Sequence, residues 1–323
     1  MRMFATMLAA AVVASTGCAT MAFAAPATEF AIGKPGFVSN DGVRVGYFEY
    51  GPADGPVVLT TGGWPGDSTL VAPLAEALAE RGMHVIRWDM RGAGATDHPT
   101  GPNAYSMENL VADFDAVVER VAPSRPVHVV GEGWPAFIAS QSANDHPGRI
   151  ASISSVGFPA LDLAGNALRR VPREKPQLVG QWAQQMAALT YLAGIQVPEL
   201  PELAVRTGIP VALLGIVARA MTDPSTPVPP TDPRDDVDGL QRYRQANWPH
   251  LTQPTFDYVD VPVLQVFQMD DDFLETPILI DGLAERTPRL ELHTLHGNHF
   301  NAMTGGNGAQ ILEDATRVIR GTE

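Results

Sequence analysis

Cysteine and long apolar runs are both scarce in this chain of 323 residues. Cys18 is the only cysteine, which excludes an intramolecular disulfide and a metal site built from cysteines. No segment approaches the ~20 uninterrupted apolar residues that a membrane span requires. The sequence therefore predicts a soluble domain whose stability does not depend on disulfides.

Positive charge is scarce as well. The chain has 22 Lys and Arg residues against 36 Asp and Glu, which gives a formal net charge of −14. Nucleic acids and acidic membranes would be repelled over most of such a surface, so neither is an expected partner. With 45% hydrophobic and 18% charged residues, the chain can bury a large core, and its length fits one large domain with an insertion.

The first 24 residues have the layout of a secretory signal peptide. Arg2 precedes an apolar run from Met7 to Val13, and the small residues Ala22 and Ala24 mark a cleavage site. In the alternative reading, Cys18 belongs to a lipoprotein signal and anchors the chain through a lipid, although the leucine usual three residues earlier is missing. We expect residues 1–24 to be removed and the protein to be periplasmic or secreted.

Beyond this segment, short apolar runs alternate with stretches whose apolar residues recur at helical spacing. The alternation predicts an α/β fold with a mostly parallel sheet that helices cover on both faces. Strands are expected at Val43–Tyr50, Pro56–Thr60, His84–Trp88, Val127–Val130 and Ala151–Val156, and helices at Leu70–Arg81 and Ser106–Val121.

The alternation stops near residue 160, and the sequence from there to residue 254 predicts a helical cap inserted into the core. Its parts are expected helices at Gln177–Ile195 and Val205–Met221 and a solvated, proline-rich acidic loop at Asp223–Asp236. The sheet pattern then resumes with strands at Val261–Phe267 and Glu291–Leu295 and a last helix at Gly308–Arg320. We thus expect a core of residues 25–159 and 255–323 with a cap of residues 160–254.

Four motifs stand at the expected ends of strands: Gly62–Pro65, Trp88–Gly94, Gly131–Pro135 and Gly297–Phe300. In this order, with a cap before the last of them, they resemble the α/β-hydrolase family, and in particular its epoxide hydrolase and haloalkane dehalogenase branch. The resemblance covers roughly Gly42 to Ile319. It implies an α/β-hydrolase fold with its site at the C-terminal ends of the strands.

The resemblance also identifies the position of the catalytic nucleophile. In that family the turn from strand to helix reads Gly-x-nucleophile-x-Gly, and here the nucleophile position is Gly133. Trp134 and the downstream segment His146–Ile150 match the family in this register, whereas a shift by one residue, which would make Glu132 the nucleophile, misplaces both. Because glycine has no side chain that can attack a substrate, covalent catalysis at this position is excluded.

Other parts of the family's site have matching residues. Asp271 matches the acid that orients the catalytic histidine, with Asp270 or Asp272 as the alternative if the register slips by one residue. His299 matches the histidine itself, because Gly-Asn-His-Phe keeps the family pattern, and the alternative is an ordinary surface histidine. A neutral imidazole held by a carboxylate is a competent general base near neutral pH.

The resemblance implies binding roles for four aromatic residues. The backbone N–H groups of Trp64 and Trp134 correspond to the oxyanion hole, although Gly62 stands where the family usually has histidine. Tyr191 and Tyr243 loosely match the cap tyrosines that hold an epoxide oxygen, and the alternative is that both only pack within helices. We expect a mainly apolar pocket lined by Trp64, Trp134 and His299.

The sequence thus predicts a hydrolase that adds water to a small apolar epoxide or ester with the help of His299 and Asp271. The alternatives are a catalytically inactive protein that binds an apolar ligand and a lyase or isomerase that only transfers protons. No cofactor and no metal are expected. The prolines within Asp223–Asp236 exclude the ligand spacing of an EF-hand calcium loop.

Overall fold

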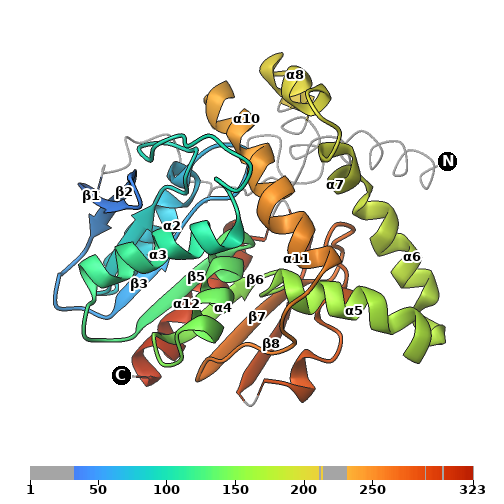
Figure 1. Cartoon of the computed structure of the whole chain (residues 1–323). Coiled ribbons are helices and arrows are strands. Elements are labelled where there is room, and N and C mark those ends of the chain that lie inside the picture. The colour runs from blue at the N-terminus through green and yellow to red at the C-terminus, as the bar shows by residue number, and fades with distance from the viewer. Residues whose placement is uncertain (1–32, 211, 214–230, 288, 300–301, 323) are drawn as a thin grey trace.

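The computed structural model describes residues 33–210, 212–213, 231–287, 289–299 and 302–322, and an eight-stranded sheet forms its centre (Figure 1). The strand order is β1-β2-β4-β3-β5-β6-β7-β8. β2 pairs antiparallel with β1 and β4, and all other neighbours pair in parallel, which confirms the predicted mostly parallel sheet. The strands are β1 (Lys34–Asn40), β2 (Val43–Tyr50), β3 (Val57–Thr60), β4 (His84–Trp88), β5 (Val127–Glu132), β6 (Ile150–Val156), β7 (Val263–Met269) and β8 (Leu290–Leu295).

The five strands from β3 to β7 are buried along their whole length. Because both of their faces meet other elements, these strands are rich in apolar residues, with some buried polar ones such as Arg87 in β4 and Gln265 in β7. β1 is not predicted, since it begins with Lys34, Pro35 and Gly36 and is partly exposed. It pairs only with β2 and therefore forms one edge of the sheet.

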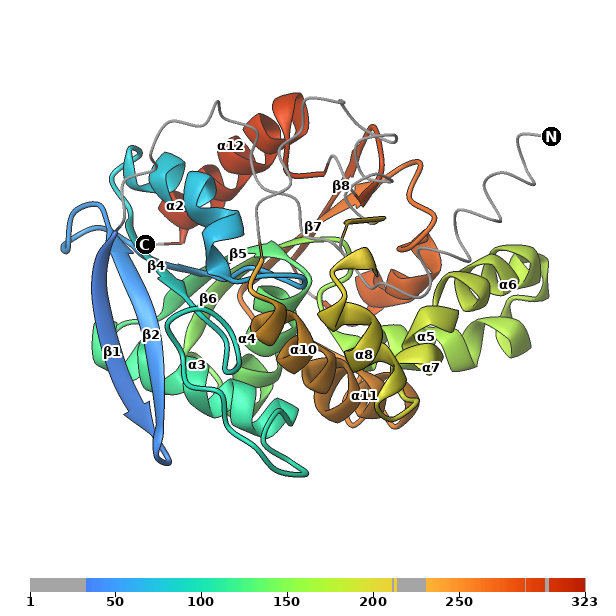
Figure 2. The same cartoon turned by 90° about the horizontal axis from the view of Figure 1, so that it is seen from above.

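Helices cover both faces of the sheet. Viewed from above in Figure 2, α2 (Ala72–Ala79) and α12 (Gly305–Gly321) lie on one side, and α3 (Met107–Val121) and α4 (Trp134–Asp145) lie on the other. The buried residues of α3 include Leu110, Phe114 and Val117, whose spacing of three to four residues places them on one face of the helix.

Between β6 and β7 the described chain forms only helical elements, in agreement with a helical insertion. The α-helices are α5 (Leu161–Glu174), α6 (Val179–Ala188), α7 (Thr190–Ile195), α8 (Leu200–Arg206), α10 (Pro233–Arg242) and α11 (Trp248–Thr252). The helix predicted at Gln177–Ile195 is divided in two at Leu189. The helix predicted at Val205–Met221 overlaps α8 only at its last two residues, because a turn at residues 207–208 ends α8. Residues 209–210 and 212–213 are helical again, and residues 211 and 214–221 lie outside the described part of the chain.

The loop predicted at Asp223–Asp236 needs a correction, because the chain is helical from Pro233 onward. The Asp232 side chain caps α10 by accepting a hydrogen bond from the Arg234 backbone N–H at 2.8 Å. Pro233 at the first position and the acidic residues Asp235 and Asp236 in the first turn are further signals of a helix start. Residues 223–230 lie outside the described residues.

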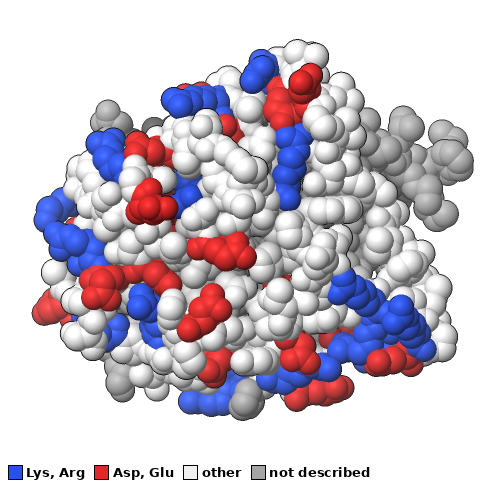
Figure 3. Space-filling view, in the orientation of Figure 1, with Lys and Arg blue, Asp and Glu red and all other residues white. Residues whose placement is uncertain are grey.

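In the described ranges no helix is both long and apolar enough to cross a bilayer. The predicted signal peptide, with Cys18, falls outside these ranges. On the face drawn in Figure 3, Lys and Arg side chains lie among Asp and Glu and form no continuous basic surface, in keeping with the net charge of −14.

Candidate active site

A cavity of about 50 Å³ lies between the cap helices and the loops that follow β3 and β5. This volume accommodates a few water molecules. Core loops contribute Gly63, Trp64, Gly133 and Trp134 to its walls, and the cap contributes Tyr191, Leu192, Tyr243 and Leu251. Most of the lining is aromatic or aliphatic, so the predicted apolar pocket is present.

The turn between β5 and α4 has the geometry of a nucleophile elbow. Gly133 has φ 65° and ψ −105°, a conformation that residues with a side chain adopt only at an energetic cost. A Cβ atom added to Gly133 would meet nothing closer than the Phe137 ring, at 3.8 Å. At Gly131 a Cβ atom would approach Pro135 to 2.6 Å, so glycine is needed there for close packing. These features support the register that places Gly133 at the nucleophile position.

Tyr243 is the centre of an aromatic cluster on the cavity wall. Its ring centroid lies 6.0 Å from Trp64, 5.7 Å from Trp134 and 6.3 Å from Tyr191, with near-perpendicular ring planes in each pair. Such edge-to-face contacts hold the rings in fixed orientations. Tyr243 begins a π-helical turn that runs to Asn247, directly after α10. Both cap tyrosines therefore line the cavity as the resemblance implies.

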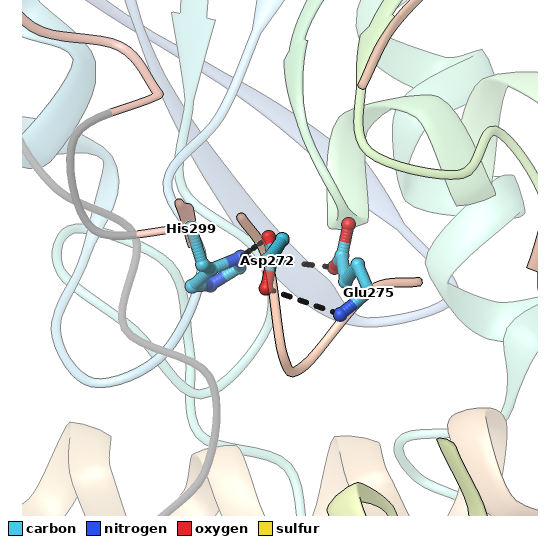
Figure 4. Close-up of side chains that lie close together, drawn as sticks. All are labelled: Asp272, Glu275 and His299. Atoms are coloured by element: carbon cyan, nitrogen blue, oxygen red, sulfur yellow. Dashed lines mark hydrogen bonds and ion pairs between the residues drawn. The ribbon is translucent and has the colours of Figure 1, made fainter. Parts of the chain in front are cut away.

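His299 lies behind this cavity, surrounded by carboxyl groups (Figure 4). Its Nδ1 atom is 3.0 Å from Glu132 Oε1, 3.8 Å from Asp272 Oδ2 and 3.9 Å from Glu275 Oε1. The Asp272 carboxylate is held by the backbone N–H groups of Leu274 and Glu275, at 2.8 and 3.2 Å. The histidine is 2% exposed. It is therefore not the surface residue of the alternative reading.

The predicted partner Asp271 needs a correction. Asp271 is exposed, and the carboxylate near His299 comes from Asp272, the next residue, which was the alternative in a register shifted by one. The other alternative, Asp270, pairs with the exposed His296 at 2.9 Å. Because the chain turns sharply after β7, consecutive side chains point in different directions, and only Asp272 points inward.

His299 also does not line the apolar cavity directly. It lines a smaller neighbouring cavity of about 10 Å³, together with Asp272 and Gln268. Glu132 and Glu275 line both cavities. The expectation that Trp64, Trp134 and His299 share one pocket is thus correct only for the two tryptophans, and the two glutamates stand between the pocket and the histidine.

Burial dominates the electrostatics of this cluster. Burial first, and then the neighbouring Glu275 and Asp272 carboxylates, raise the pKa of Glu132 well above its usual range. Burial and Asp272 likewise raise the pKa of Glu275 well above its usual range, against a hydrogen bond from the Phe158 backbone N–H. Burial lowers the pKa of His299, although the nearby Asp272 opposes this effect.

Sequence reasoning gives neither Glu132 nor Glu275 a catalytic role. Glu132 stands one residue before the nucleophile position. The sequence suggests it only as a nucleophile in the register shifted by one residue, which misplaces Trp134 and His146–Ile150. Glu275 reaches the cluster because Gly157, with φ 81°, has no side chain, and a Cβ atom there would overlap the Glu275 carboxylate. A glycine directly after a buried strand is a signal of such a close approach.

The start of α10 attaches the cap to the core beside this cavity. Trp64 Nε1 donates to the Asp236 backbone oxygen at 2.7 Å, and the Gly66 backbone N–H donates to the Asp236 carboxylate at 3.0 Å. Asp235 accepts from the Gly94 backbone N–H at 2.8 Å. Burial raises the pKa of Asp236 to about 6. Asp235 and Asp236 therefore make structural contacts with the core, and they are not part of the solvated loop that the sequence predicts at Asp223–Asp236.

Curated relatives of the chain include proteins named as epoxide hydrolases. The chain is 30% identical over 284 residues to "Probable oxidoreductase EphD" of Mycobacterium tuberculosis, an alignment that covers 82% of this chain and 46% of that protein. It is 32% identical over 127 residues to "Epoxide hydrolase A" of Mycobacterium tuberculosis, which covers 39% of each chain. The chain thus spans less than half the length of these two relatives.

Solved structures show the same fold. The epoxide hydrolase VrEH1 from Vigna radiata superposes with a TM-score of 0.65 at 21% identity, over 89% of this chain and 98% of the other. Epoxide Hydrolase A from Mycobacterium thermoresistibile superposes with a TM-score of 0.63 at 18% identity and the same coverage. Residues 56–306 match the model of the alpha/beta hydrolase fold family. The match includes the elbow, the cap and His299, and the chain belongs to the α/β-hydrolase fold family.

Proposed function

We propose that the protein hydrolyses a small apolar epoxide by direct addition of water, without a covalent intermediate, and that small apolar esters are its second substrate class. The Gly133 position has no side-chain atom that can attack a substrate, and an added Cβ atom there would make only ordinary contact with the Phe137 ring, at 3.8 Å. Aromatic and aliphatic side chains form most of the cavity wall and favour an apolar substrate. A relative named "Epoxide hydrolase A", 32% identical over 127 residues, supports this reaction class.

One observation carries the proposal: two carboxyl groups face the cap tyrosines across the cavity. Glu132 and Glu275 line the same cavity as Tyr191 and Tyr243, and both also contact the space that holds His299. An epoxide needs a hydrogen-bond donor at its oxygen and a proton acceptor for the attacking water. The tyrosine hydroxyls are suited to the first task, and the imidazole of His299, whose pKa is lowered by burial, is suited to the second.

The proposed reaction is a single displacement. A water molecule above Gly133 attacks an epoxide carbon, the bond from that carbon to the epoxide oxygen breaks, and the cluster around His299 takes the proton that the water loses. The oxygen that is released takes a proton from a cap tyrosine, which regains one from solvent, and the product is a diol. The N-terminal end of α4, which begins at Trp134, adds a partial positive charge near developing negative charge.

The test is a screen of small aromatic epoxides and esters with the purified protein and two matched histidine variants. His299→Ala removes the buried imidazole, and we expect it to lower turnover by about 10²-fold or more. His296→Ala serves as the control, because its ring is 94% exposed and pairs with Asp270 outside the cavity. Equal activity of both variants would remove His299 from the mechanism. Tight binding of the epoxides without any turnover would instead indicate a binding protein.

A further inference from the structure

Four side chains from three distant parts of the sequence converge on the smaller cavity. Glu132 ends β5, Asp272 and Glu275 follow β7, and His299 follows β8. One ligand atom from each of Asp272, Glu275 and His299 lies within 4.8 Å of the others (Figure 4). Glu132 Oε1 is closer still to His299 Nδ1, at 3.0 Å. A cation with bonds of about 2.1 Å holds neighbouring ligand atoms roughly 3.0 to 3.4 Å apart, so the ligand atoms of Asp272, Glu275 and His299 would move roughly 0.5 to 1.5 Å closer together when an ion binds.

The charge of this cluster is not balanced by other side chains. The side chains of Glu132 and Asp272 are 3% and 4% exposed, and that of Glu275 is 12% exposed. Among the described residues, no Lys or Arg forms an ion pair with any of the three. Without a cation, burial favours the protonated form of Glu132 and Glu275, as their raised pKa values indicate, and a bound cation would allow them to ionise.

Glu132 provides an independent indication of a ligand. Both of its carboxyl oxygens are buried and neither has a hydrogen-bond partner. The contact with His299 Nδ1 is short, at 3.0 Å, but its geometry is not that of a hydrogen bond. The carboxylate oxygen and the ring nitrogen thus lie close together without a hydrogen bond that joins them. This arrangement is expected when both atoms are ligands of the same ion.

We propose that Glu132, Asp272, Glu275 and His299 form a binding site for one divalent transition-metal ion. Three carboxylates and one imidazole are a mixed set of ligands that suits Mn²⁺ or Zn²⁺. Mg²⁺ and Ca²⁺ prefer oxygen ligands alone and should bind more weakly. This site differs from the sequence-based expectation of no metal, because its ligands are too far apart in the sequence to form a recognisable spacing.

The proposed site does not depend on hydrolytic activity, because binding is measured without substrate. Its position also suits the reaction. Glu132 and Glu275 separate the ion from the apolar cavity, and Gly133 has no side chain that would block a water molecule between them. A water bound to such an ion loses a proton more readily than free water, which would compensate for the missing nucleophile.

The test uses the full chain, purified with a chelator and then dialysed. Titration calorimetry with MnCl₂ and ZnCl₂ should give about one equivalent of bound metal per chain. The melting temperature should rise by roughly 5 °C at metal concentrations far above the dissociation constant. Glu132→Gln and Asp272→Asn should each weaken binding at least about tenfold. Asp270→Asn is the matched control, since it removes a partly exposed carboxylate two residues from Asp272 and should leave binding unchanged.

Two results would overturn the proposal. The first is the absence of saturable binding to the wild-type chain. The second is binding that Glu132→Gln and Asp272→Asn leave unchanged, because such binding would show an ion on the surface only. Misfolding is checked in chelator, where Glu132→Gln should be at least as stable as the wild type because it removes one of several repelling carboxylates. If that variant does not fold, Glu275→Gln takes its place. Metal binding without turnover would refute the proposed hydrolysis and keep the site. Turnover together with no saturable metal binding would refute the site and keep the proposed hydrolysis.

Discussion

Replacing Gly133 by aspartate would put a carboxylate back at the elbow between β5 and α4. Gly133 has φ 65° and ψ −105°, and a residue with a side chain in such a conformation is destabilised by about 1 to 3 kcal/mol. For a domain of this size, with about 2.1 cal/mol/K of unfolding entropy per residue, that change lowers the melting temperature by roughly 2 to 5 °C. The nearby Glu132 and Glu275 carboxylates should add to this loss, because like charges repel in a buried site.

Gly133→Ala separates the two contributions. Its Cβ atom would meet the Phe137 ring at 3.8 and 3.9 Å, which is ordinary contact, so only the backbone strain remains. Unfolding of both variants is followed by urea denaturation. Gly133→Asp should also create a second route for epoxide hydrolysis, with an alkyl ester at residue 133 that mass spectrometry detects as the added mass of the substrate. If Gly133→Ala proves neutral or stabilising, residue 133 is not at a strained elbow and the assignment of the nucleophile position is wrong.

Four further predictions follow from single contacts. Gly157→Ala should destabilise the protein by about 2 kcal/mol or more and lower its activity, because φ 81° disfavours a side chain and the added methyl group overlaps the Glu275 carboxylate. Urea denaturation and the activity assay measure these two effects. Tyr243→Phe should lower kcat about 10²-fold, because the hydroxyl lost from the cavity wall is the expected proton donor. The control Tyr258→Phe should leave kcat unchanged, because the Tyr258 side chain lies outside the cavity. Steady-state kinetics of the two variants measure the difference. The pKa of Asp236 is raised from 3.8 to about 6, so its contribution to stability is fully present below pH ~3.8 and is lost as the pH rises through about 6. The urea stability of the wild type should therefore fall by up to roughly 3 kcal/mol relative to that of Asp236→Asn across this range, and parallel curves would contradict it. Mass spectrometry of the exported protein should find Ala25 at the N-terminus, and a lipid on Cys18 would show that the alternative signal is used.

The central strands and the elbow are predictable because local chemistry determines them. β3 to β7 are buried on both faces and are therefore rich in apolar residues, although β6 also contains three serines. The elbow requires a backbone conformation that glycine adopts freely, and Gly133 with Trp134 after an apolar run indicates that turn directly. The first turn of α10 has strong helix-start signals, which the proline-rich composition of Asp223–Asp236 obscures.

The partners of His299 are not predictable in this way, because they depend on contacts between distant segments. Asp270, Asp271 and Asp272 are identical in type and consecutive, so no pattern shows which one points inward. Glu275 reaches the site only because Gly157, more than a hundred residues earlier, leaves room for its carboxylate. The position of Glu132 between two cavities follows from the packing of the cap on the sheet, which no local signal encodes.

The most direct test of direct water addition is a single turnover in water labelled with oxygen-18, with enzyme in excess over epoxide. Direct attack predicts that the diol from the first turnover carries the labelled oxygen and that the protein carries none. A covalent route predicts the opposite, with unlabelled oxygen in the first diol and the label in a protein carboxylate. Label found in Glu132 after repeated turnover would show that this residue is the nucleophile and would contradict the mechanism proposed for Gly133.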